Sequence, residues 1–202
     1  MSGIVIDIDG VVADSEKYLV KHIEKSSGKK LTFTNPRTFQ FSADIPTEDL
    51  VRYIEEAIIL YKEVIKPCDP ASTYIALLIL EKKFGVVNFL SARSSKTEEA
   101  TRWWLDKNFP KLNYNLMNLG EDKRKVDWMR ETGFDTIVED RFKTANECDF
   151  DNGYTFLINQ PWNAGRREWG HVNRVNNLYQ AVEKYLRWLR YDLTREINSI
   201  IL

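Results

Sequence analysis

Short apolar runs recur along the chain at intervals that predict strands of one sheet. The first run, Gly3 to Ile8, is β-branched and stops at Asp9-Gly10, which is a turn signal. Four later runs have the same short, bounded form: Val86 to Leu90, Tyr114 to Met117, Thr136 to Val138 and Tyr154 to Ile158. Because its residues are apolar on both faces, the first run predicts a central, buried strand.

Helical patterns separate these runs. Asp69-Pro70 resembles an N-cap followed by Pro at the first helical position, and Gly85 closes that pattern. Ser95 and Glu98 stand at capping-box spacing. Other predicted helices cover about 15–27, 47–65 and 122–131, a short segment after the fourth strand, and an amphipathic C-terminal stretch through Leu178, Val182, Leu186, Leu189 and Leu193. Alternation of this kind predicts an α/β fold, a doubly wound parallel sheet with helices on both faces.

Residues 14–70 interrupt the alternation. They contain helical patterns but no strand of the predicted sheet, and the polar stretch from Lys29 to Asp44 shows no periodicity and is expected to be loop-rich. We therefore predict a small helical cap at 14–70, inserted after the first strand of an α/β core at 1–13 and 71–202. The C-terminal helix could close the core or form a homodimer contact, and the sequence leaves both open.

Composition narrows the classes of partner. The chain has 202 residues, 43% of them hydrophobic, and a formal net charge of −1 without a basic stretch, which argues against duplex nucleic acid and leaves small anions open. Cys68 and Cys148 have neither disulfide nor zinc spacing, so a reducing cytoplasm is expected. Because the first strand begins at Gly3, we expect no signal peptide, and the longest later apolar run, Tyr74 to Leu80, is too short to span a bilayer.

Polar side chains stand where the predicted strands end, and ligands of open α/β sheets bind at that edge. Asp7 and Asp9 end the first strand. One carboxylate could attack phosphorus and bind a metal, and the other could act as general acid and base. Both could equally be ordinary turn or capping residues.

Other strand ends add anion and metal ligands. Ser91 ends the second strand before a helix N-terminus, where free N–H groups bind anions, although Ser94 or Ser95 could be simple N-caps. Lys123 and Lys125 lie near the start of a helix and either face solvent or bind an anion. Glu139-Asp140 ends the fourth strand, so acidic pairs at two strand ends would need a cation between them, for which Mg²⁺ is suited.

Together these motifs resemble the haloacid dehalogenase superfamily over nearly the whole chain. The match rests on Asp7-Ile8-Asp9-Gly10-Val11-Val12, Ser91, Lys125 and Glu139-Asp140. The resemblance implies a magnesium-dependent phosphomonoester hydrolase with Asp7 as nucleophile and Asp9 as acid/base. It implies Mg²⁺ ligands from Asp7, Asp140 and the main-chain carbonyl of Asp9, and phosphate contacts from Ser91, Ala92, Lys125 and Gly10. Lys123 competes with Lys125, which we prefer for its spacing to Asp140.

Within that superfamily, the first motif, Ser91-Ala92-Arg93, Glu139-Asp140-Arg141 and Pro161-Trp162-Asn163 are similar to 5'(3')-deoxyribonucleotidases and their bacterial and phage relatives. Glu139 departs from them, since Asp is common there. The resemblance implies a nucleoside monophosphate substrate and deoxyribonucleotide catabolism. Candidate substrate contacts are Arg93, Arg141, Trp162, Asn163 and Phe41.

Each of these contacts has an alternative. Arg141 could pair with Glu139, Trp162 and Asn163 could anchor a loop, and Phe39 and Phe41 could pack the cap against the core. Two other functions also remain: a sugar-phosphate phosphatase or phosphomutase of the same superfamily, and a non-catalytic protein that binds a phosphorylated ligand.

Overall fold

A computed structural model describes residues 3–31, 33–35, 40–41, 45–120, 123–148, 154–165, 170 and 172–190. Its centre is a six-stranded sheet in the order β5-β4-β1-β6-β7-β8, in which every pairing is parallel. The strands are β1 (Ile4–Ile6), β4 (Val87–Ser91), β5 (Tyr114–Asn118), β6 (Thr136–Glu139), β7 (Tyr154–Ile158) and β8 (Val172–Val175). The predicted doubly wound α/β fold is confirmed.

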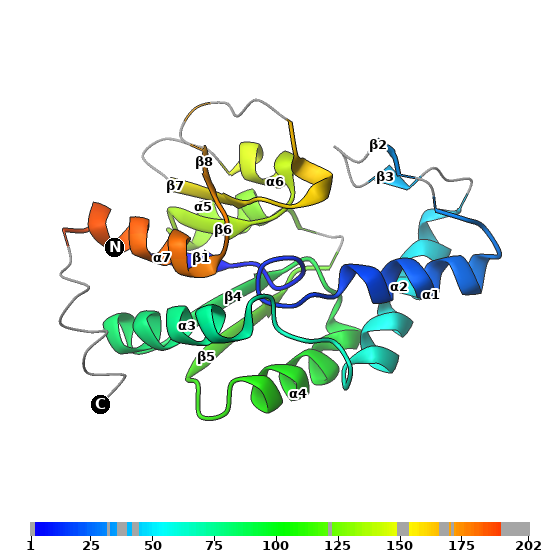
Figure 1. Cartoon of the computed structure of the whole chain (residues 1–202), viewed down its shortest axis with the longest axis horizontal. Helices are drawn as coiled ribbons and strands as arrows, with labels where there is room; N and C mark the ends of the chain where they lie inside the picture. The colour runs from blue at the N-terminus through cyan, green and yellow to red at the C-terminus, as the bar shows by residue number, and fades with distance from the viewer. Residues whose placement is uncertain are drawn as a thin grey trace.

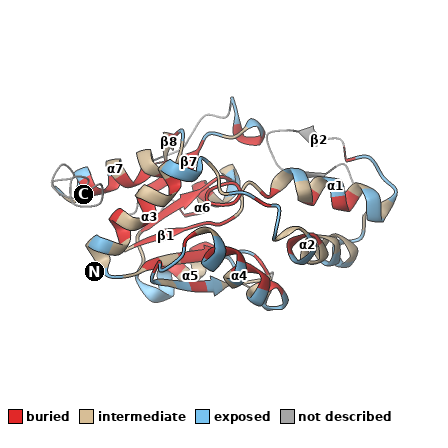
Figure 2. Ribbon diagram, turned by 60° about the horizontal axis from the view of Figure 1, so that its bottom comes forward, coloured by how far each residue is buried: buried red, intermediate tan, exposed pale blue. Residues whose placement is uncertain are grey.

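Helices cover both faces of this sheet (Figure 1). Ile4 and Ile6 belong to one apolar cluster with residues of α3 (Pro70–Phe84), α4 (Glu98–Asn108) and α7 (Leu178–Trp188). Val5, between them, belongs to another with α5 (Lys125–Thr132), while α6 (Phe142–Glu147) contacts β6 and β7. Because strand side chains alternate between faces, β1 is buried from both sides, as the red strands in Figure 2 show.

The C-terminal helix closes the core. Asn177 caps α7 by accepting a hydrogen bond from the backbone N–H of Gln180. The buried residues of α7 recur at helical spacing and pack against α3: Leu178, Ala181, Val182, Tyr185 and Leu186. Leu193 lies outside the described residues. Within the described part of the chain, no helix has both the length and the apolar character needed to cross a membrane.

Residues between β1 and α3 form a separate layer at one end of the sheet, at the right of Figure 1. It contains α1 (Glu16–Ser27), α2 (Thr47–Tyr61) and two short antiparallel strands, β2 (Phe33–Asn35) and β3 (Gln40–Phe41). The two ends of the insertion meet, since Asp14 N–H donates to Lys66 and Cys68 N–H donates to Val12. Leu19 and Ile58 share an apolar cluster with Ala100 of α4. We propose the 14–70 cap on this basis.

Three local predictions were wrong. The stretch expected to be loop-rich also contains β2 and β3. The segment between β7 and α7, for which no strand was predicted, contains a 3-10 turn at Pro161–Asn163 and then β8. The Ser95/Glu98 capping box does not form, because Ser95 begins a 3-10 turn and Glu98 pairs with Arg102. Ser94 is no side-chain cap either, since its hydroxyl donates to Glu55 of α2.

Candidate active site

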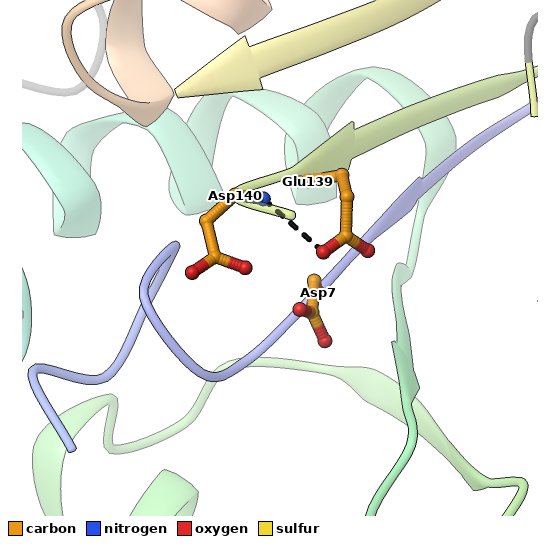
Figure 3. Close-up of side chains that lie close together, drawn as sticks. All are labelled: Asp7, Glu139 and Asp140. Carbon is orange, nitrogen blue, oxygen red and sulfur yellow. Dashed lines mark hydrogen bonds between the residues drawn. The ribbon is translucent and has the colours of Figure 1, made fainter. Parts of the chain in front are cut away.

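Three carboxylates meet at the carboxyl edge of the sheet, where β1 and β6 end side by side. Ligand atoms of Asp7, Glu139 and Asp140 lie within 4.8 Å of one another, and all three residues are buried (Figure 3). The backbone holds Asp7 beside the end of β6, because its N–H donates a hydrogen bond to the carbonyl of Val138 at 2.9 Å. From β1 the chain continues to β4 and β5 on one side of β1, and it then crosses to β6 on the other side. The edge between β1 and β6 is therefore a topological switch point.

Burial makes ionisation of this cluster costly. Burial, followed by the charge of Glu139, raises the pKa of Asp7 to about 7. Burial, Glu139 and Asp7 together raise the pKa of Asp140 well above its usual range. Asp140 Oδ1 is buried without a hydrogen-bond partner, which is expensive for a carboxylate. An orphaned oxygen in an all-oxygen donor set fits a hard cation such as Mg²⁺.

Lys125 is the buried cation beside this cluster. Its Nζ lies 2.7 Å from Asp7 Oδ1 and 2.7 Å from Glu139 Oε2. Burial alone would lower the pKa of Lys125, but the two neighbouring carboxylates together have the larger effect and raise it. Burial alone would raise the pKa of Glu139, but the neighbouring positive charges, that of Lys125 foremost, together have the larger effect and lower it. Lys123 instead pairs with Glu131 near the surface. This geometry supports our preference for Lys125, whose phosphate contact remains a prediction.

Asp9 is held by a different cation. Arg93 donates from Nε to Asp9 Oδ2 at 2.9 Å and from Nη2 to Oδ1 at 2.7 Å, and Ser15 donates to Oδ1 at 2.5 Å. Burial would raise the pKa of Asp9, but Arg93 and then Ser15 lower it to about 2. The remaining Arg93 nitrogen donates to Thr101. Arg93 is held by Asp9 and Thr101 and also lines the candidate active-site cavity, and its contact with substrate stays a prediction.

The turn after β1 lies against Asp140. Gly10 has φ +74°, and a Cβ there would collide with the Asp140 carboxylate, so glycine is required twice over. The Gly10 N–H donates to the carbonyl of Ala13 at 2.9 Å. Gly10 also lines the candidate active-site cavity, and its contact with phosphate stays a prediction.

Trp162 and Asn163 support Asp140 from a 3-10 turn after β7. Trp162 Nε1 donates to Asp140 Oδ2 at 3.0 Å, and its side chain lines the candidate active-site cavity. Asn163 Nδ2 donates to the carbonyls of Asp140 and Ile158, and its Oδ1 accepts from Gln160 and Arg174. Asn163 is thus a buried loop anchor in this structure, and its contact with substrate stays a prediction.

The other predicted site residues are placed as follows. Ser91 is fully buried and accepts a hydrogen bond from Arg93 N–H, while Ala92 lines the cavity. Arg141, the residue after Asp140, also lines the cavity, and its backbone N–H donates a hydrogen bond to the Glu139 side chain. Phe41 lies in β3, but its side chain is outside the described part of the chain, as is Phe39. The roles of Ser91, Ala92 and Arg141 stay predictions.

Solved structures with a similar architecture include several hydrolases. A hydrolase from Pseudomonas syringae superposes with a TM-score of 0.61 at 12% identity, over 92% of this chain and 98% of that one. A HAD hydrolase of family IA, variant 3, from Entamoeba histolytica gives 0.58 at 14% identity, over 91% and 100%. CbbY from Rhodobacter sphaeroides, in complex with phosphate, gives 0.58 at 13%, over 88% and 94%. The chain has the haloacid dehalogenase-like fold. No family model and no curated protein matches its sequence.

In this haloacid dehalogenase-like fold, a cavity of about 320 Å³ lies between the carboxyl edge of the sheet and the insertion. Its floor includes Asp7, Asp9, Asp140 and Lys125. Its opposite wall comes from α1 and α2 and is mainly aliphatic: Leu19, Ile23, Val51, Ile54 and Ile58. The rim carries the cations Lys123, Arg124 and Arg141. The arrangement can therefore hold an anionic group at the floor and an apolar group beneath the cap helices.

Sequence reasoning missed several residues of this site. Glu139 was expected in an acidic pair with Asp140 but was not named as a site residue, yet it belongs to the carboxylate cluster and binds Lys125. Ser15 was not considered, although it follows the first motif closely in sequence and bonds Asp9. Thr101 and Glu16 carry no sequence signal that distinguishes them from other polar helix residues.

Replacing Asp140 with asparagine should stabilise the metal-free protein and abolish its stabilisation by Mg²⁺. The change replaces a carboxyl group that is costly to ionise in this buried cluster with a neutral amide, a relief of about 1–3 kcal/mol.

The stability of the metal-free wild type should depend on pH through Asp7. Because folding raises the pKa of Asp7 from 3.8 to about 7, the protein should lose stability as pH rises through this window, and Mg²⁺ should restore more of it at pH 8 than at pH 5. Thermal unfolding with and without Mg²⁺ measures both effects; equal Mg²⁺ stabilisation of variant and wild type would contradict them.

Proposed function

We propose that this protein is a magnesium-dependent phosphomonoester hydrolase that forms an aspartyl-phosphate on Asp7. The observation that carries the proposal is the position of the Asp7 carboxylate, which lines the cavity floor between Lys125 and Asp140. A carboxylate in this position can attack phosphorus, and the acyl phosphate it forms is readily hydrolysed.

The chain's own residues account for the proposed steps. An Asp7 oxygen bonds to phosphorus as the bond from phosphorus to the leaving oxygen breaks; water then attacks phosphorus and releases Asp7. Lys125 balances negative charge beside the phosphoryl group. Asp9, ionised beside Arg93, is set to accept the proton of the attacking water, and must first take up a proton to protonate the leaving oxygen.

Asp7 and Asp140, with Glu139 beside them, would hold the Mg²⁺, together with the predicted carbonyl of Asp9. The bound ion would supply positive charge next to the phosphoryl oxygens. The orphaned Asp140 oxygen and the raised pKa values of the two aspartates support this assignment.

The proposed substrate is a nucleoside monophosphate, with a deoxyribonucleotide preferred. Besides the resemblance of the motifs, the aliphatic wall formed by α1 and α2 supports it, because such a wall suits the face of a nucleobase better than a polyol. A sugar phosphate is the second candidate, because the structurally similar CbbY has been solved with xylulose-(1,5)bisphosphate.

Phosphate release from a substrate panel tests the function. The panel holds ribo- and deoxyribonucleoside 5'- and 3'-monophosphates, sugar phosphates and 4-nitrophenyl phosphate, each with Mg²⁺ and with a chelator. We expect Mg²⁺-dependent release that is fastest from the nucleotides. Faster release from sugar phosphates would move the substrate to the second candidate. If the protein binds these ligands but releases phosphate from none of them, the proposed enzymatic function would be wrong and a phospho-ligand-binding role would take its place.

A further inference from the structure

Glu16 places an unengaged carboxylate on the wall of the cavity. It lies in the first turn of α1, is half-buried and lines the cavity with Leu19 and Ile23. Within the described part of the chain, its side chain makes no hydrogen bond or ion pair. Burial, followed by the charge of Asp14, raises the pKa of Glu16 to about 7, which shows how little the protein itself compensates this group.

The other acidic residue of the cap wall is already engaged. Glu55 of α2 accepts hydrogen bonds from the Ser94 hydroxyl at 2.6 Å and from Lys96 Nζ at 3.2 Å, and these contacts connect the cap to the core. Glu55 therefore has a structural partner for each carboxylate oxygen. Glu16 has none, although both side chains line the same cavity.

Helix electrostatics do not explain the position of Glu16. An acidic residue in the first helical turn is favoured by the helix dipole, and Glu48 fills that role in α2 while exposed to water. Glu16 has the same place in its helix but turns into the cavity, where its neighbours are aliphatic. A half-buried acceptor loses part of its hydration there, and a donor from the ligand can restore the lost hydrogen bond.

We propose that Glu16 is a specificity-determining residue that accepts a hydrogen bond from an amino group on the leaving group of the substrate. The aliphatic wall around it selects an apolar ring. The inference rests on the proposed function and narrows its substrate class. Among nucleoside monophosphates, it selects those whose base carries an amino group over those that present a carbonyl at the same position.

Pairs of substrates that exchange an amino group for a carbonyl test this inference. We would measure kcat and KM for dCMP against dUMP and for dAMP against dIMP, using wild type, Glu16→Gln and Lys17→Gln with Mg²⁺. Wild type should favour the amino-bearing member of each pair by about 10-fold or more in kcat/KM, as expected for a hydrogen bond to a charged group. In Glu16→Gln, whose amide both donates and accepts, the ratio should fall to about 1, mainly through KM.

Lys17→Gln is the matched control, because Lys17 is the next residue of α1, is exposed and does not line the cavity. It should keep the wild-type ratio, and thermal unfolding should show that both variants are folded. Release from 4-nitrophenyl phosphate and the nucleotides, with equal ratios in wild type and Glu16→Gln, would overturn the Glu16 inference alone. No release by wild type from any phosphomonoester would overturn the proposed function and this inference together.

Discussion

Replacing Asp7 with asparagine should lower kcat for phosphate release by about 10⁴-fold or more, because the amide cannot form the aspartyl-phosphate. The substitution keeps the size of the side chain and removes a carboxylate that is costly to bury, since its pKa is raised to about 7. The variant should therefore stay folded and be at least as stable as wild type near neutral pH. Phosphate release and thermal unfolding on the same preparation separate loss of chemistry from loss of structure.

Asp14→Asn is the matched control for this variant. Asp14 follows the same motif, but its side chain is about half exposed, pairs with Lys17 and does not line the cavity. It should retain wild-type turnover within a factor of a few. Substantial turnover by Asp7→Asn would show that another group attacks phosphorus. In that case, a rapid-quench experiment on the wild-type protein would find no labelled phosphate on Asp7.

Strands β1, β4, β6 and β7 could be predicted because their apolar runs are buried on both faces, and the edge strand β5 from its short run alone. β7 was predicted with its observed bounds, and β1, β4, β5 and β6 within a few residues. β8 was missed because it lies at the edge of the sheet, where only Val172 and Val175 are buried and the two residues between them are partly exposed. A Val-Asn-Arg-Val sequence carries no continuous apolar signal, so only its pairing with β7 identifies it as a strand.

The convergence of the acidic residues could also be predicted, whereas their partners could not. Parallel strands end at a common edge, so the sequence alone predicts that Asp7 and Asp140 lie near one another. Arg93 lies beside the second motif, and sequence gave no reason to pair it with Asp9 rather than with substrate. Likewise, only the three-dimensional structure shows that Glu16 lines the cavity and that Asn163 lacks free hydrogen-bonding capacity.

Lys125→Met should cost about 3–5 kcal/mol of folding free energy, because it leaves two carboxylates buried without their cation. Lys125 connects Asp7 and Glu139, so its loss should also displace the nucleophile and reduce kcat by at least about 100-fold. Chemical denaturation and phosphate release with saturating Mg²⁺ measure the two effects, and Mg²⁺ should recover part of the stability by adding positive charge near Asp7.

Lys123→Met tests the competing assignment. Its ion pair with Glu131 is exposed, and surface pairs of this kind contribute about 0–1 kcal/mol, so this variant should have nearly wild-type stability and turnover. Loss of turnover in Lys123→Met with activity retained in Lys125→Met would assign the phosphate contact to Lys123. In that case Lys125 would serve only to neutralise the buried carboxylates, and the stability loss of Lys125→Met would persist without a kinetic effect.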